Sequence, residues 1–249
     1  MQTTGNTILI TGGGSGIGRG LAEAFHRQGN QVIIAGRRQA VLDEVIAANS
    51  GMAGFTVDMT DAASIAALAS QAIAAFPALD AVINNAGIMV NEDLVGGDTL
   101  SIAEETVATN LLGPIRLTAA LLPHLLAQPG ATVLTVSSGL AFVPLAATPT
   151  YSATKAAIHS WSQSLRHQLR NTAVDVLEIA PPYVQTFLQG AHQARDPHAM
   201  PLDDFIAETM TLLAGTPDKG EVLVERVHPL RFAEQTGKAA TMFGFVNPA

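Results

Sequence analysis

The chain contains no cysteine among its 249 residues. Disulfide bonds, thiolate nucleophiles and zinc–thiolate sites are therefore excluded together. Charged residues make up only 14% of the chain and aromatic residues 5%, yet no stretch reaches the ~18 uninterrupted apolar residues of a membrane-spanning helix. The first residues carry no basic segment followed by an apolar run, so we expect no secretory signal, no membrane contact and a cytoplasmic protein.

Basic residues are also scarce. The formal net charge is -8 and the pI is about 5.2, a balance that disfavours a nucleic-acid partner or an anionic membrane surface. The seven histidines show no ligand-like clustering, so we expect no metal site. A hydrophobic fraction of 48% in a chain of this length is enough for one large core.

Short apolar segments alternate with helical patterns along most of the chain. Repeated units of this kind predict a parallel sheet with helices on both faces, that is, a three-layer, doubly wound α/β fold. We expect one domain over residues 1–249, with a substrate-loop region at about 183–215. The expected strands are 7–11, 31–35, 54–57, 81–83, 131–136, 174–179 and 221–224, and the expected helices are 21–29, 40–48, 62–76, 102–128, 151–170 and 203–213.

A glycine-rich loop, Gly12-Gly-Gly-Ser-Gly-Ile-Gly18, joins the first strand to the first helix. Glycines permit a tight turn and a close approach of backbone to phosphate, and the N–H groups at the helix start attract an anion. The alternative is a merely flexible turn. The flanking strand and helix favour a dinucleotide site.

Tyr151 and Lys155 are four residues apart on an expected helix, so they share one face. A lysine one turn away favours the phenolate and is expected to lower the tyrosine pKa. The pair then has the parts of a proton donor and acceptor. Taken alone, the same spacing also fits two solvated surface residues.

Four motifs occur in a fixed order: the glycine loop with Thr11 before it, Asn84-Asn-Ala-Gly87, Ser138, and Tyr151-x-x-x-Lys155. Together they resemble the short-chain dehydrogenase/reductase family over residues 7–186. The segments 136–146 and 154–159 also resemble a bacterial branch labelled DltE-like. The resemblance implies a Rossmann-type fold and an oxidoreductase in which a nicotinamide cofactor supplies the hydride.

The resemblance also implies roles for four side chains. Ser138 hydrogen-bonds the substrate oxygen, Tyr151 exchanges a proton with it, and Lys155 holds the ribose hydroxyls. Asn110 accompanies a helix irregularity and leads water to the lysine. Ser137 is the neighbouring candidate, and strand alternation lets only one of the two serines face the site.

The cofactor is expected to be NADP(H), because Gly36 stands where an acidic residue selects NAD(H) and two arginines follow it, Arg37 and Arg38. The family resemblance implies that Asp58 and the Met59 backbone lie at the adenine, although Asp58 also fits a simple helix-start carboxylate. Pro182 departs from the family's glycine at that position. The remaining implied cofactor contacts are Gly12, Ser15, Gly16, Ile17, Gly18, Asn85, Ala86, Gly87, Tyr151, Lys155, Pro181, Val184 and Thr186.

The leading hypothesis is therefore an NADP(H)-dependent enzyme that interconverts a ketone or aldehyde and an alcohol. The alternatives are an NAD-dependent alcohol dehydrogenase and a noncatalytic dinucleotide sensor. The substrate loops are mainly apolar, apart from Glu92, Asp93 and Asp196, so we expect a neutral substrate.

We also expect a homodimer through helix 102–125 and the Tyr151 helix. A tetramer is possible, although the unusual C-terminus weakens that expectation.

Overall fold

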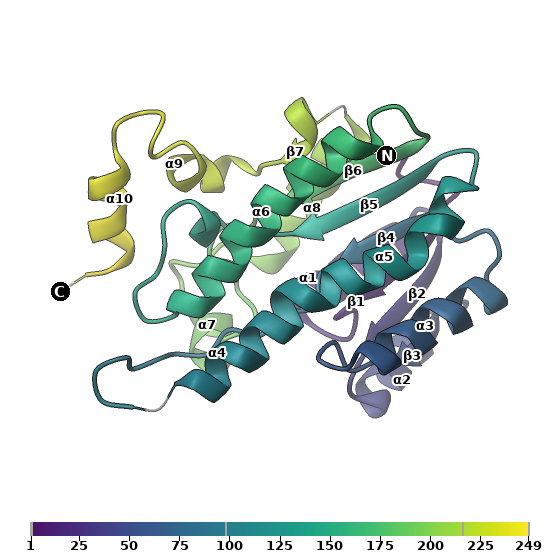
Figure 1. Cartoon of the computed structure of the whole chain (residues 1–249), viewed down its shortest axis with the longest axis horizontal. Helices are drawn as coiled ribbons and strands as arrows, with labels where there is room; N and C mark the ends of the chain where they lie inside the picture. The colour runs from purple at the N-terminus through teal and green to yellow at the C-terminus, as the bar shows by residue number, and fades with distance from the viewer. Residues whose placement is uncertain (1, 98, 216, 249) are drawn as a thin grey trace.

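The computed structural model describes residues 2–97, 99–215 and 217–248. Within these ranges, seven parallel strands form one sheet in the order β3-β2-β1-β4-β5-β6-β7 (Figure 1). The predicted α/β fold is confirmed. The strands are β1 Thr7–Thr11, β2 Gln31–Gly36, β3 Ala53–Thr56, β4 Ala81–Asn84, β5 Ala131–Val136, β6 Val174–Ile179 and β7 Glu221–Val222.

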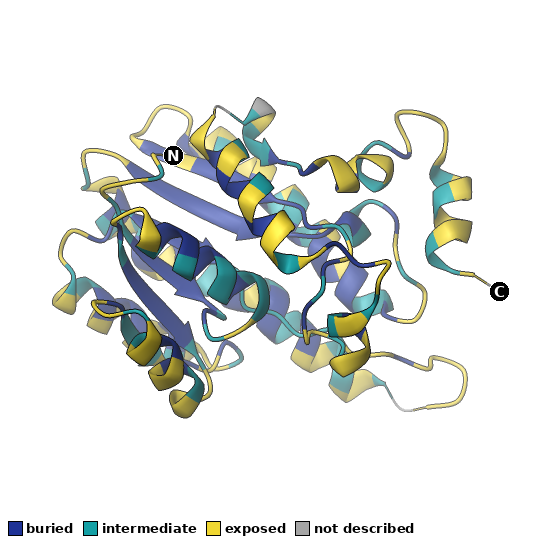
Figure 2. Ribbon diagram, turned by 180° about the vertical axis from the view of Figure 1, so that it is seen from behind, coloured by how far each residue is buried: buried dark blue, intermediate teal, exposed yellow. Residues whose placement is uncertain are grey.

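Helices cover both faces of the sheet (Figures 1 and 2). Helices α1, α2 and α8 pack on one face, and α3, α5 and α6 pack on the other. None of the helices in the described ranges is both long and apolar enough to cross a membrane. The α-helices are α1 Gly16–Arg27, α2 Gln39–Ala48, α3 Ala62–Ala75, α4 Leu100–Val107, α5 Gly113–Leu126, α6 Pro149–Leu169, α7 Ala191–Arg195, α8 Leu202–Ala214, α9 His228–Arg231 and α10 Ala239–Val246.

The strands read as apolar runs because both of their faces are buried. In β1, Ile8 and Ile10 pack with α1 and α8, whereas Leu9 between them points to the α3 and α5 side. Side chains on a strand alternate between faces, so one strand contributes to two cores. The sheet is thereby held between two apolar layers.

The direction of winding reverses between β1 and β4. From β1 the chain builds outward through β2 and β3, and it then returns to place β4 on the other side of β1. The loops that leave β1 and β4 therefore part to opposite faces, which opens a crevice at the carboxyl ends of the strands. The glycine loop and Asn85 lie at this point.

The expected helix 102–128 is three segments. Helix α4 is followed by a π-helical segment, η1 Ala108–Leu112, and then by α5. Pro114 lies in the first turn of α5, where its missing N–H costs little. The π-helical segment thus interrupts the helix just before Pro114, whereas Pro123 lies inside α5 without ending it.

The C-terminal region departs most from expectation. Strand β7 ends at Val222, not Val224, and α9 and α10 follow where no helix was expected. Helix α10 has no buried residue and stands away from the body (Figures 1 and 2). Its far end is tied back by Asn247, which accepts from the Ala146 N–H at 2.6 Å and donates to the Pro144 carbonyl at 3.0 Å.

Candidate active site

A cavity of about 770 Å³ opens at the carboxyl ends of the strands, where the sheet winding reverses. Its wall includes most of the residues implied by the sequence motifs. These are Gly12, Ser15, Gly16, Ile17, Arg37, Arg38, Asp58, Met59, Asn85, Ala86, Gly87, Ser138, Tyr151, Lys155, Pro181, Val184 and Thr186. Gly18 and Asn110 are the two predicted site residues that do not line it.

The glycine loop forms one wall, directly before α1. Gly12 and Gly16 have φ of +67° and +53°, a region that favours glycine. A side chain at Gly18 would collide with the Gly12 carbonyl and the Asn85 amide, so Gly18 serves the packing of helix against strand. Ser15 makes no side-chain cap to α1, and the start of this helix offers its amides to an anionic group. The wall therefore fits a dinucleotide pyrophosphate.

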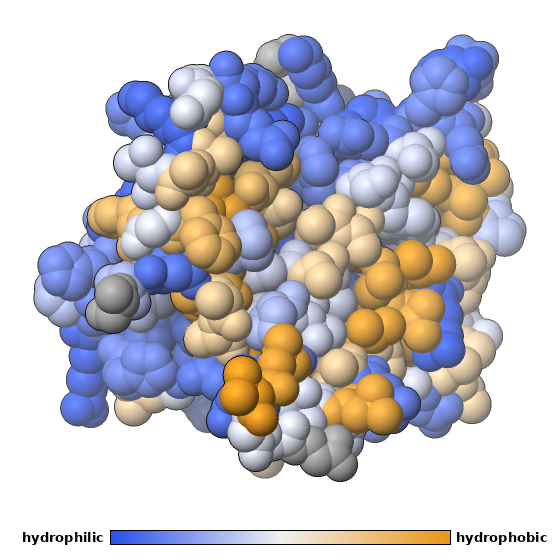
Figure 3. Space-filling view, turned by 60° about the vertical axis from the view of Figure 1, so that its left-hand side comes forward, coloured by the Kyte–Doolittle hydropathy of each residue, from blue (hydrophilic) through white to orange (hydrophobic). Residues whose placement is uncertain are grey.

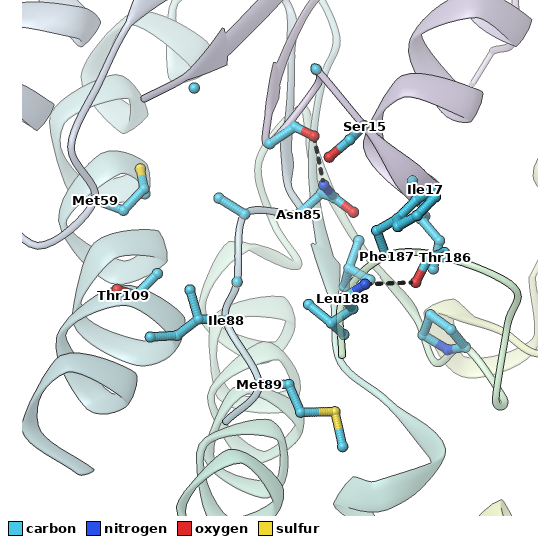
Figure 4. Close-up of a pocket in the computed structure, with 18 of the residues that line it drawn as sticks. Ser15, Ile17, Met59, Asn85, Ile88, Met89, Thr109, Thr186, Phe187 and Leu188 are labelled. Carbon is cyan, nitrogen blue, oxygen red and sulfur yellow. Dashed lines mark hydrogen bonds between the residues drawn. The ribbon is translucent and has the colours of Figure 1, made fainter. Parts of the chain in front are cut away.

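Asn85 links the glycine loop to the segment that follows β4. Its side-chain amide donates to the Thr11 carbonyl at 2.9 Å and to the Gly12 carbonyl at 3.4 Å. The Thr11 hydroxyl in turn accepts from the Asn85 and Ala86 backbone N–H groups. Figure 4 shows Asn85 beneath the glycine loop, with Thr186, Phe187 and Leu188 on the side of Ile17.

Ser138, Tyr151 and Lys155 meet at the other end of the cavity. Ser138 follows β5, and its hydroxyl oxygen accepts from the Leu140 N–H at 3.1 Å. Tyr151 lies in the first turn of α6 and Lys155 one turn later; they are 6% and 5% exposed. The Lys155 Nζ donates to the Val136 carbonyl at 2.7 Å and lies 5.5 Å from the centre of the Tyr151 ring.

Burial dominates the electrostatics of the pair. It raises the pKa of Tyr151 to about 12, and a side-chain hydrogen bond with Ser138 only partly opposes this. Burial also lowers the pKa of Lys155 to about 8, against the field of Glu178. The net pKa of Tyr151 is therefore raised in this structure, where the sequence led us to expect a lowered one. Removal of each group from water penalises its charged form, and this burial is the largest cause of both shifts.

Both serines after β5 belong to the cavity wall. The Ser137 hydroxyl, however, donates to the Ile179 carbonyl at 3.3 Å. The regular alternation ends with β5 at Val136, and the chain turns into the short helix η2 Gly139–Ala141. Ser138 remains the serine next to Tyr151.

Asn110 lies in the π-helical segment, which confirms the expected helix irregularity. Its side chain accepts from the Ile88 N–H at 2.9 Å and donates to the Ile88 carbonyl at 2.8 Å. Asn110 thus fixes the loop after β4 through two hydrogen bonds, without lining the cavity itself. The adjacent Thr109 does line the cavity, and its buried hydroxyl has no hydrogen-bond partner.

Arg37, Arg38 and Asp58 surround the far end of the cavity. Arg37 is 59% exposed on its side chain and lies 3.8 Å from a Glu105 carboxylate oxygen. Asp58 accepts from the N–H and hydroxyl of Thr60, which, together with the charge of Arg37, lowers its pKa. The alternative role of Asp58 at the helix start is wrong, because Asp61 caps α3 through the Ala63 N–H.

The sequence of residues 6–197 matches the family model of the short chain dehydrogenases. The chain belongs to this family. It is 41% identical to the oxidoreductase DltE of Bacillus subtilis, over 94% of this chain and 93% of that protein. The oxidoreductase SA2266 of Staphylococcus aureus is 30% identical over 91% of this chain and 98% of its own length. The DltE-like resemblance is confirmed.

Solved structures agree in fold. A short chain dehydrogenase from Burkholderia cenocepacia in complex with NADP superposes with a TM-score of 0.85 at 23% identity, and each chain is covered fully. A relative from Burkholderia phymatum in complex with NAD gives 0.81 at 22% identity, over 96% of each chain. Both nicotinamide dinucleotides therefore occur among proteins with the fold of this short-chain dehydrogenase.

Several residues of the cavity wall were not singled out from the sequence. The Gln193 side chain, on α7 inside the expected substrate-loop region, donates to the Val184 carbonyl at 2.8 Å and the Thr186 hydroxyl at 3.2 Å. The apolar wall residues carry no chemical signature in the sequence. Only those that follow β4 or Thr186 could be expected near the cavity from their position. The additional wall residues include Gly14, Val41, Leu42, Val57, Ile88, Met89, Val90, Thr109, Phe187, Leu188 and Gln193.

Glu92 was expected among the few charges of the substrate loops. In this dehydrogenase it is buried, and its carboxylate accepts from the Thr150 N–H at 2.9 Å and the Thr150 hydroxyl at 2.7 Å. A carboxylate at the first turn of a helix is well placed against the helix dipole. Glu92 therefore ties its loop to the start of α6, beside Tyr151, and leaves the substrate side without its charge.

Proposed function

We propose that this short-chain dehydrogenase uses NADP(H) to interconvert a ketone or aldehyde with an alcohol. The observation that carries the proposal is the convergence of Ser138, Tyr151 and Lys155 on one end of a cavity whose other end holds Arg37 and Arg38. The serine, tyrosine and lysine can bind a substrate oxygen and exchange a proton with it. The two arginines suit the 2′-phosphate of the cofactor.

The bound cofactor supplies hydride to the substrate carbon in the reductive direction. In this chain the Tyr151 hydroxyl gives its proton to the substrate oxygen as negative charge develops there. A pKa of about 12 keeps that hydroxyl protonated at neutral pH, so it is ready to act as the acid. Ser138 donates a hydrogen bond to the same oxygen, and the Lys155 ammonium stabilises the resulting phenolate.

The proton must then return to Tyr151. In the proposed route it passes through Lys155 and water held near Asn110. Gly87 lies between the two, since a side chain there would come 3.3 Å from the Asn110 Oδ1 and 3.7 Å from the Lys155 Nζ. Glycine at this position keeps that space open.

The substrate is proposed to be neutral and largely apolar. Of the charged residues in the cavity wall, Arg37, Arg38 and Asp58 lie at the far end, and Lys155 is buried beside Tyr151. Figure 3, which brings the left-hand side of Figure 1 forward, shows apolar side chains gathered in the middle of this face. Val90, Phe187 and Leu188, which line the cavity, are exposed apolar side chains.

A panel of carbonyl compounds assayed with NADPH tests this function. For pairs with the same carbon skeleton, we expect kcat/KM to be at least ~10-fold higher for the neutral member than for the carboxylate. Among the described wall residues, the arginines lie at the far end, and the Lys155 ammonium already donates to the Val136 carbonyl. A preference for the carboxylates would contradict the substrate class. A complete lack of turnover across the panel would favour the sensor.

The cofactor preference is tested at Arg37. Its contact with Glu105 is long and exposed, so it competes weakly for the guanidinium. We expect Arg37→Ala to raise the KM for NADPH ~10- to 100-fold, the loss of one charged hydrogen-bonding group, and to leave NADH turnover nearly unchanged. Arg27→Ala, in the last turn of α1, is the control. Equal use of NADPH and NADH by the parent protein would favour the NAD-dependent alternative.

The assembly is proposed to be a cytoplasmic homodimer that pairs α4, α5 and α6 of each subunit. Leu112 and Leu126, at either end of the α5 region, are exposed apolar side chains, which supports burial of this surface in a dimer.

A further inference from the structure

A buried carboxylate faces α6, the helix of Tyr151 and Lys155, and takes no part in the catalytic steps proposed above. It belongs to Glu178 on β6, which is 1% exposed. Its register partners are Thr135 on β5 and Glu221 on β7. Thr135 hydrogen-bonds Ser162 of α6, so this row of side chains faces α6. A buried charge of this kind is costly unless it is paired.

His159 is its partner. The His159 Nδ1 lies 3.0 and 2.9 Å from the two carboxylate oxygens of Glu178. Because a carboxylate only accepts, Nδ1 carries the donated proton. On its other side, the Nε2 of His159 lies 2.9 Å from the amide of Gln163, and the ring meets Phe142 edge-on at 4.8 Å. The imidazole is therefore fixed on three sides.

His159 and Lys155 are one turn apart on α6, so the carboxylate that His159 holds lies along the same helix face as the ammonium. Lys155 reaches the carbonyl of Val136 at the end of β5. Val136 pairs with Ile179, the residue after Glu178. The ammonium of Lys155 thus reaches the β5–β6 strand pair one register position beyond the carboxylate of Glu178.

Other charges in the region are already paired. Glu221 accepts two hydrogen bonds from Arg231 of α9, at 2.6 and 2.8 Å, and Arg231 lies over the Phe142 ring. Arg166 of α6 donates to the carbonyls of Val176 and Gly220. Of these two carboxylates, Glu178 is the one whose charge acts on Lys155.

We propose that Glu178, held by His159, is a positioning residue that keeps the Lys155 ammonium in its charged form. The significance for catalysis rests on the role proposed above for Lys155; the electrostatic coupling does not. Burial alone drives the pKa of Lys155 downward, and the carboxylate of Glu178 opposes that fall. Without the carboxylate, the lysine would lose its proton nearer to neutral pH and could no longer stabilise a phenolate.

Lysine NMR tests the coupling without cofactor or substrate. The chain has three lysines, Lys155, Lys219 and Lys238, so a ¹³C-lysine spectrum is simple to assign with Lys155→Arg. We expect the titration midpoint of Lys155 to fall by about one pH unit in Glu178→Gln, the low end of the effect of a nearby opposite charge. Gln keeps the shape and can still accept from His159.

Two variants separate charge from packing. Glu221→Gln changes the neighbouring carboxylate in the same register row and should leave the Lys155 midpoint in place. Glu178→Asp keeps the charge and should stay closer to the parent midpoint than Glu178→Gln does. If Glu178→Gln does not fold, the double variant Glu178→Gln/His159→Gln replaces both side chains by amides. The Lys155 midpoint of this double variant is then compared with that of His159→Gln alone. An unchanged or raised Lys155 midpoint after loss of the Glu178 charge would overturn the proposal.

The kinetic consequence is measured separately. In Glu178→Gln the alkaline limb of the kcat/KM profile should move to lower pH by the same amount, about tenfold in rate at a pH on that limb. Glu221→Gln should leave the limb where it is. A shifted NMR midpoint without any measurable carbonyl reduction would uphold the coupling and reject the proposed function, so the two failures are distinguishable.

Discussion

Tyr151→Phe is expected to lose carbonyl reduction by ~10³-fold in kcat, within the range that a positioned general acid contributes. The change removes one oxygen atom from a side chain that is almost fully buried at the end of the cavity. Ser138 would still donate to the substrate oxygen, but no group would give it a proton. Water cannot easily replace the hydroxyl, because Tyr151 fills that part of the wall.

Cofactor binding distinguishes loss of chemistry from loss of structure. NADPH affinity, followed by fluorescence, should remain within a few-fold of the parent, since Lys155 and the glycine loop are untouched. Tyr183→Phe is the matched control: Tyr183 is the other tyrosine of the chain, and it is partly exposed and bonds Asp196. Reduction at the parent rate by Tyr151→Phe would reject the proposed mechanism.

Much of the fold could be predicted because each strand is a short apolar run with a turn signal beside it. Strands β5 and β6 occur at the expected residues, 131–136 and 174–179. The glycine loop was equally readable, since its φ angles and close approaches require glycine. In such segments the local sequence already determines the backbone geometry.

The unpredicted features depend on contacts between distant segments. Glu92 reads as an exposed loop charge until the fold brings it to Thr150. Glu178 lies in β6, whose other buried residues are apolar, and its contact with His159 explains a carboxylate there. Phe243 and Phe245 are apolar, yet both are exposed on α10. Periodicity reports which face is apolar, but not which partner a polar group finds.

The burial of Lys155 has a consequence for stability. A folded pKa of about 8, against ~10.4 for a free lysine, means that below pH 8 both states carry the proton and the native state bears the full cost of a buried charge. As pH rises above 8, the native state releases its proton while the unfolded chain keeps it. The parent protein should therefore become more stable as pH rises from 8 toward 10.

Lys155→Met isolates this effect. Between pH 7 and 9.5 the unfolding free energy of the parent should rise by ~2 kcal/mol relative to that of the variant, measured by urea denaturation without cofactor. Stopping at pH 9.5 avoids Tyr151, whose raised pKa removes stability only above pH 10. Lys238→Met, at an exposed site, should track the parent. Parallel pH profiles for parent and Lys155→Met would show that the ammonium is not buried at a cost. A gain confined to the parent would mean that the chain holds this lysine at the expense of its own stability, which a purely structural residue would not explain.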